Sequence, residues 1–179
     1  MLTNLMVRLD QRYPTPGEKS AVADYVASFA DRLAAYDEMR TKQKEIVDDI
    51  LEEYQVMYPR FKQYHPQGWE KGRRDLELYH TFSANAMLMD DKRWLDEACL
   101  FWVCTMMKAA HLTPQFMQDA CRLWDKYLQQ HLTPQTYELN RPYFDHIASR
   151  LCNIPEPHKA EVGERRSGAA APRVPAGVR

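Results

Sequence analysis

Residues 72–78 read Gly-Arg-Arg-Asp-Leu-Glu-Leu, and the interpretation of the whole chain depends on this stretch. It lies near the start of a predicted helix over residues 69–89, in which Arg74 and Asp75 are neighbours of opposite charge. The planar fork of an arginine suits a carboxylate, and an aspartate accepts hydrogen bonds from N–H groups. Taken alone, the stretch is typical of a solvated helix start, so the flanking sequence decides its meaning.

The flanking sequence predicts an all-α fold. Apolar residues recur at spacings of three and four, strand-like alternation is missing, and glycine is scarce, with six in the chain. We expect helices over residues 2–11, 16–40, 42–58, 69–89, 92–111, 114–130 and 134–153, with a loop over residues 59–67.

Three helix starts are marked by Thr-Pro pairs, because a threonine hydroxyl caps free backbone N–H groups and proline fits the first helical turn. The pairs are Thr15-Pro16, Thr113-Pro114 and Thr133-Pro134. Glu18 stands three residues after Thr15 and completes a capping box. Pro142 lies inside the last predicted helix and is expected to kink or break it.

Length and composition indicate one soluble domain. The 179 residues are 45% hydrophobic and 27% charged, with a net charge of −1, so we expect neither a nucleic-acid partner nor a membrane partner. We expect a domain over residues 1–153 and a disordered tail over residues 154–179, rich in Pro, Gly, Ala and Arg. The end of that tail, residues 167–179, is compatible with vector-derived read-through.

The four cysteines favour a reduced, cytoplasmic setting, because they form no CxxC pair and have no histidine at zinc-finger spacing. They are Cys99, Cys104, Cys121 and Cys152. The first three stand among large apolar residues and are expected in the core. No metal site is predicted.

The stretch 72–78 resembles the segment of phycobiliproteins that holds an open-chain tetrapyrrole, a bilin. The family pattern is Cys-x-Arg-Asp-hydrophobic-Glu-hydrophobic, and the cysteine sulfur carries the bilin. Arg74 and Asp75 match this pattern, whereas Gly72 occupies the attachment position. The resemblance therefore implies that the polar grip on a bilin can survive without the covalent bond.

Further segments extend the resemblance over roughly residues 20–150. Ala-Met-Leu-Met-Asp-Asp at 86–91 resembles the family's Ala-Ile-Leu-Ala-Gly-Asp, and Leu-Asp-Glu-Ala-Cys-Leu at 95–100 resembles its Leu-Asp-Asp-Arg-Cys-Leu. Leu-Thr-Pro at 112–114 is similar to the family's Gly-Thr-Pro, and Leu-Thr-Pro at 132–134 with Tyr-Phe-Asp at 143–145 resembles its last helix. The implied fold is globin-like, preceded by an N-terminal helical pair. The resemblance is closest to bilin biosynthesis-associated globins that lack the attachment cysteine.

The resemblance also implies a set of ligand-binding residues. Asp75 would accept hydrogen bonds from the pyrrole N–H groups of a bilin, and Arg74 would clamp a propionate. Lys71 and Arg73 would serve the second propionate. Tyr79 and His80, further along the same helix, complete the candidate set.

The predicted function is a non-enzymatic, phycobiliprotein-related globin associated with bilin biosynthesis. It would bind a bilin without a covalent bond or assist the enzymes that make bilins, as a homodimer through its N-terminal helices. No nucleophile, acid–base pair or phosphate loop is apparent, so catalysis is not expected. Haem is not expected either, because the middle of the helix over residues 92–111 has no histidine.

Two alternatives stay open. The protein is instead a ligand-free interaction or signalling module if side chains such as Trp69, Tyr79 or His80 fill the pocket. A set of large apolar residues either lines a pocket for a flat aromatic ligand or forms ordinary core. That set is Trp94, Trp102, Met106, Met107, Phe116 and Trp124.

Overall fold

The computed structural model describes residues 12–110 and 112–153, and all regular elements in these ranges are helical. The all-α prediction is therefore confirmed for this part of the chain. The helices are α2 (Pro16–Met57), α3 (Phe61–Tyr64), α4 (Gly68–Met89), α5 (Lys92–Leu95), the π-helix η1 (Asp96–Leu100), α6 (Phe101–Ala109), α7 (Pro114–His131) and α8 (Pro134–Leu151). The predicted helix over residues 2–11 and the predicted tail over residues 154–179 lie outside the described residues.

The predictions at the helix starts are confirmed. Thr15 caps α2, its side chain accepts from the backbone N–H of Glu18, and the Glu18 side chain accepts in return. The hydroxyl groups of Thr113 and Thr133 cap α7 and α8 in the same way. These local signals work because a cap depends on residues within one turn of each other.

The prediction of two helices over residues 16–40 and 42–58 is wrong, because α2 is continuous through this junction. No glycine or proline interrupts it there, and Thr41 donates its hydroxyl hydrogen bond to the carbonyl of Asp37, 2.8 Å away, inside the same helix. The loop predicted over residues 59–67 contains the short helix α3.

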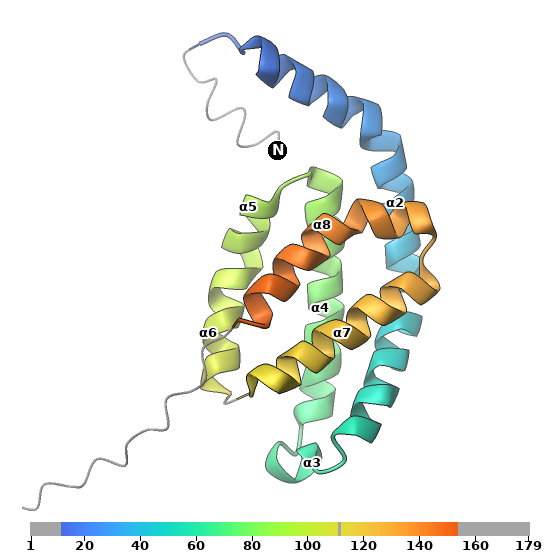
Figure 1. The fold of residues 1–179 in the computed structure, drawn as a ribbon, viewed down its shortest axis with the longest axis vertical. Coiled ribbons are helices and arrows are strands. Elements are labelled where there is room, and N and C mark those ends of the chain that lie inside the picture. Colours follow the sequence, from blue (N-terminus) through green and yellow to red (C-terminus); the bar gives the residue numbers. More distant parts are fainter. Residues whose placement is uncertain (1–11, 111, 154–179) are drawn as a thin grey trace, which may run out of the picture.

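Two other expectations need correction. The helix predicted over residues 92–111 is divided, because one turn of π-helix, η1, joins α5 to α6. Pro142 does not break α8, which continues to Leu151. Figure 1 shows α8 as one bent helix, which agrees with the kink that was the other expected outcome.

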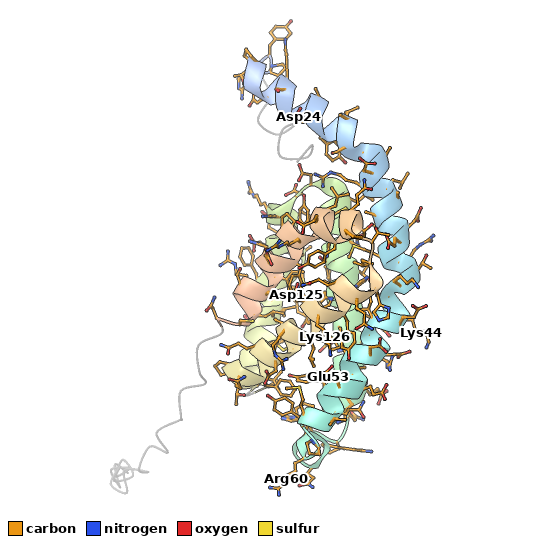
Figure 2. All side chains as sticks on the ribbon, turned by 45° about the vertical axis from the view of Figure 1, so that its right-hand side comes forward. Asp24, Lys44, Glu53, Arg60, Asp125 and Lys126 are labelled. Atoms are coloured by element: carbon orange, nitrogen blue, oxygen red, sulfur yellow. The ribbon has the colours of Figure 1, made fainter. Side chains whose placement is uncertain are left out.

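The second half of α2 packs against α4, α7 and α8, and α7 and α8 run antiparallel beside each other (Figure 1). The centre of this bundle is mainly apolar and includes Met39, Ile50, Met87, Leu123 and Ile147, each 0% exposed. It also contains a buried hydrogen bond from Ser83 in α4 to Asn140 in α8. On its outer side, Lys126 lies 2.5 Å from the carboxylate of Glu53 and ties α7 to α2 (Figure 2). The bundle thus has a largely hydrophobic core with a few buried polar contacts, and ion pairs lie at its margins.

The first half of α2 behaves differently, and we call residues 16–34 the arm. Figure 2 shows the arm, with Asp24 on it, extending beyond the bundle. Tyr25 is its one buried residue, and its hydroxyl donates to the carbonyl of Leu88 over 3.1 Å. Arg32 donates to the carbonyl of Met87 over 2.5 Å. The arm is therefore anchored by two side chains rather than by a core of its own.

Within the described ranges, none of the helices combines the length and the apolar character needed to cross a lipid bilayer.

Candidate ligand-binding site

A cavity of about 600 Å³ opens between the start of α4, the short helix α3 and the facing ends of α6 and α7. Its volume falls in the range of sites for organic ligands. The inner wall is apolar and includes Leu51, Met107, Met117 and Trp124. The mouth lies at the first turns of α4, where polar side chains gather.

One wall of the cavity is aromatic. The ring of Phe61 in α3 stacks on Phe116 with centroids 4.8 Å apart and packs on Trp69 at 4.7 Å. Tyr54 meets Trp69 edge to face at 5.7 Å. Gly68 permits this arrangement, because a Cβ at that position would clash with the Phe61 ring. A wall of tilted and stacked rings is suited to pack against a flat conjugated ligand.

The rim of the cavity is polar and comes from one turn of α4. Lys71, Gly72, Arg74 and Asp75 all line the opening. The Nη2 atom of Arg74 lies 3.2 Å from Oδ1 of Asp75, and their side chains are 70% and 24% exposed. At Gly72 an added Cβ would meet nothing within 4 Å, so the rim is open at this point.

Tyr79 lies one turn deeper than Asp75 on α4 and also lines the cavity. Its side chain is buried, and its hydroxyl makes no hydrogen bond to any other described residue. Burial, and to a lesser degree the charge of Asp75, raise the pKa of Tyr79, so it stays a neutral phenol. It is a hydrogen-bond donor available to a ligand.

The amino-acid sequence is similar to those of known proteins. Residues 7–151 match the family of phycobilisome proteins. The chain belongs to the phycobilisome protein family. It is 24% identical over 156 residues to the allophycocyanin alpha-B chain of Pyropia yezoensis, covering 82% of this chain and 96% of that protein. It is also 24% identical over 163 residues to the allophycocyanin subunit alpha-B of Picosynechococcus sp. (strain ATCC 27264 / PCC 7002 / PR-6), covering 84% and 98%.

Membership of the phycobilisome protein family identifies the fold as globin-like, in agreement with the all-α bundle. Both relatives are matched over nearly their whole length, so the similarity extends over the arm and the bundle alike. The cavity therefore lies in a domain of phycobilisome type.

Two of the six predicted ligand-binding residues point elsewhere in this phycobilisome-family chain. Arg73 extends to α2, where its Nη1 lies 2.5 Å from the carboxylate of Asp48. His80 is 1% exposed, and its Nε2 lies 2.9 Å from the carbonyl of Met39. Neither residue lines the cavity. The reason is helical geometry, since each step of one residue turns a side chain by about 100°.

Burial lowers the pKa of His80 to about 4, which keeps the imidazole neutral. The neutral ring donates from Nε2 to the carbonyl of Met39, while its buried Nδ1 has no hydrogen-bond partner among the described residues. This histidine joins α4 to α2 and is a structural residue of the bundle.

The sequence could not decide whether one set of large apolar residues lines a pocket or forms ordinary core. In the structure this set divides into two groups. Met106, Met107, Phe116 and Trp124 line the cavity. Trp94 instead packs against Phe82, with ring centroids 5.6 Å apart, and Trp102 is 40% exposed on α6.

Some of the cavity residues have no recognisable signal in the sequence. Phe61 and His65 stand in a stretch predicted to be a loop, and Tyr54 reads as one more position of an apolar stripe. In the part of the chain that the structure describes, no group of three or more His, Cys, Asp or Glu residues could hold a metal ion.

Proposed function

We propose that this protein binds a bilin non-covalently in the cavity and serves bilin biosynthesis as a non-enzymatic accessory protein. The observation that carries the proposal is the position of Arg74 and Asp75 on the rim of a cavity of about 600 Å³ with an aromatic wall. Names of relatives that are allophycocyanin chains support the same class of ligand.

The residues of the cavity fit a linear tetrapyrrole in both shape and chemistry. A bilin supplies a conjugated plane, central pyrrole N–H groups and two propionate groups. The rings of Phe61, Trp69 and Phe116 offer packing surfaces for the plane. The carboxylate of Asp75 accepts from the pyrrole N–H groups and favours a protonated ligand.

The cations of the rim fit the two propionate groups. Arg74 binds one of them, with its guanidinium exposed at the opening. Lys71, which lines the opening one turn earlier, binds the other. We leave Arg73 and His80 out of the binding set, because Arg73 pairs with Asp48 and His80 with the backbone of Met39.

Reversible binding distinguishes this proposal from a pigment-carrying role. Gly72 occupies the position of the attachment cysteine in the resemblance described above, so the rim has no sulfur for a thioether bond there. A site that holds its ligand only by polar and apolar contacts releases it again. This property suits a protein that receives a bilin from one enzyme and passes it to another.

We also propose that the protein self-associates through the arm. Val26, Phe29 and Leu33 repeat at helical spacing and are 63%, 43% and 45% exposed. Val26 and Leu33 point away from the side of Tyr25 and Arg32 that faces the bundle, whereas the Phe29 ring also packs on Tyr25 with ring centroids 5.9 Å apart. An exposed apolar stripe on an extended helix is typical of a contact between subunits.

A titration with biliverdin and with phycocyanobilin tests the proposed function. Binding is expected to sharpen the long-wavelength absorption and shift it to the red. Arg74→Ala should weaken binding about tenfold, because a charged hydrogen bond to a propionate is lost, whereas Arg73→Ala should stay within about twofold. An unchanged spectrum at saturating protein would refute the proposal, and so would equal effects of the two arginine variants.

The ligand-free interaction module is the second candidate. The exposed stripe on the arm supports it, whereas the open cavity speaks against the version in which Trp69, Tyr79 or His80 fill the pocket. Absence of bilin binding together with self-association through the arm would favour this candidate.

A further inference from the structure

Two thiols meet behind the inner wall of the cavity. Cys121 lies in α7, is 7% exposed and lines the cavity. Cys152 follows the last residue of α8 and is partly buried. The Sγ atom of Cys152 lies 3.9 Å from the carbonyl oxygen of Met117, one turn before Cys121 on α7. Inside α7 the carbonyl of Met117 accepts from the backbone N–H of Cys121, so the antiparallel packing of α7 and α8 brings the Cys152 sulfur beside Cys121.

The two thiols differ in reactivity. The neighbouring Cys152 sulfur and burial raise the pKa of the Cys121 thiol. The neighbouring Cys121 thiol lowers the pKa of Cys152 below that of an ordinary thiol. Since the thiolate is the reactive form, the more exposed Cys152 is the sulfur that reacts first.

We propose that Cys121 and Cys152 form a reversible disulfide that makes this protein sensitive to hydroperoxides. The Cys152 thiolate attacks hydrogen peroxide, forming an S–O bond while the O–O bond breaks and hydroxide leaves. Cys121 then loses its proton and attacks the sulfenic sulfur, forming the S–S bond and releasing a second hydroxide. Both hydroxide ions become water, so two thiols are oxidised and one peroxide is reduced.

The position of Cys152 permits the bond. The two sulfur atoms must come within about 2 Å of each other to form the bond. Cys152 stands in the turn that ends α8, after Leu151, so its backbone can shift without the loss of helical hydrogen bonds in the body of α8. Cys121 sits inside α7 and provides the fixed partner.

The disulfide also acts on the cavity, and this step rests on the proposed function. Cys121 and Leu151 both line the cavity wall. Drawing Cys152 onto α7 pulls the adjacent Leu151 toward α7 and narrows the inner end of the cavity. We expect oxidised protein to bind biliverdin about fivefold more weakly than reduced protein.

Peptide mapping by mass spectrometry tests the bond itself in the full-length, ligand-free protein. After treatment with hydrogen peroxide and blocking of free thiols, the peptides of Cys121 and Cys152 should appear linked, with the mass of two hydrogen atoms lost. The thermal midpoint should rise by roughly 5–10 °C and return after reduction with dithiothreitol. No linked peptide, or a link between other cysteines, would overturn the proposal.

Single variants separate the roles of the two sulfurs. Cys121→Ala should stop the reaction at the sulfenic acid of Cys152, which dimedone traps. Cys152→Ser should give neither a linked peptide nor a trapped adduct on Cys121. Cys104→Ala is the matched control and should still form the bond, because its sulfur lies near Arg150 and not in the pair. A dimedone adduct on Cys121 in place of Cys152 would contradict the assigned order.

Biliverdin titrations of the oxidised and the reduced protein test the link to the cavity. Weaker binding by the oxidised form supports it, and equal affinity overturns it. Failure of both forms to bind biliverdin would refute both the proposed function and the effect of the disulfide on the cavity. The disulfide itself is tested separately by the peptide mapping.

Discussion

Arg74 donates a hydrogen bond to its own neighbour, with its Nη2 atom 3.2 Å from Oδ1 of Asp75. The pair lies at the mouth of the cavity and is largely exposed on the arginine side. Ion pairs of this exposure contribute at most about 1 kcal/mol. A ligand propionate can therefore take the guanidinium from Asp75 and leave the carboxylate free for the pyrrole N–H groups.

Asp75→Asn tests whether Asp75 binds the pyrrole N–H groups while Arg74 binds a propionate. The variant keeps the size of the side chain but loses the charge that favours a protonated bilin. We expect the absorption band of the protonated bilin to weaken more than the affinity, as measured by titration with phycocyanobilin at constant pH. Glu77→Gln on the same helix is the control, and equal loss of band and affinity in Asp75→Asn would contradict the assigned role.

Gly72→Cys should allow a bilin to attach covalently. A Cβ at Gly72 meets no atom within 4 Å, so the new thiol has free space at the cavity mouth. A bilin with an electrophilic ethylidene group should add to it without a leaving group, raising the protein mass by the mass of the bilin. Mass spectrometry under denaturing conditions measures this adduct.

Gly17→Cys serves as its control, because Gly17 is equally uncrowded but lies on the arm. Equal labelling of the two variants would show that the cavity does not direct the reaction.

Gly68→Ala should damage the aromatic wall. The added methyl group displaces the Phe61 ring, so we expect the free energy of unfolding to fall by about 1–3 kcal/mol. Gly72→Ala has open space and replaces a helical glycine, so it should raise that energy by about 0.5–1 kcal/mol. Urea unfolding measures both, and bilin affinity should fall only in Gly68→Ala. Changes of the same sign in both variants would refute this account.

His80 should make stability depend on pH. Its pKa falls from 6.5 to about 4 on folding, so the unfolded chain binds the proton more readily. The free energy of unfolding should be unaffected by this group above pH 6.5 and fall by about 3 kcal/mol between pH 6.5 and 4. Urea unfolding at several pH values measures the slope.

His80→Gln is the matched variant, because an amide N–H can still donate to the carbonyl of Met39 but does not titrate. Its stability should lose less with falling pH than that of the wild type over the same range. Parallel curves for the two proteins would show that His80 does not contribute.

Val26→Glu should weaken self-association through the arm. Val26 is 63% exposed in the apolar stripe, so the charge disrupts a contact between subunits but not the bundle. Sedimentation over a range of concentrations should show a shift to monomer without a change in helical content. Val56→Glu is the control, because Val56 is 78% exposed and lies away from the arm, and an identical shift there would argue against the stripe.

The sequence by itself determined the features that depend on neighbours along the chain. Helical periodicity and the capping threonines Thr15, Thr113 and Thr133 lie within single turns, so they can be read without coordinates. The Arg74–Asp75 pair on α4 was apparent for the same reason. The sequence also shows Gly72 two residues before that pair, at the position of the attachment cysteine in the phycobiliprotein pattern. That substitution raised the question of covalent attachment.

Tertiary structure alone decided which side chains share a space. The two adjacent arginines look alike in the sequence, yet Arg73 reaches Asp48 on α2 while Arg74 reaches the cavity. Phe61 became part of the wall only because α3 folds back onto Phe116. Helical geometry fixes the angle between successive side chains, but packing of distant helices chooses which face is covered, and that choice involves contacts too far apart in the chain for local patterns to encode.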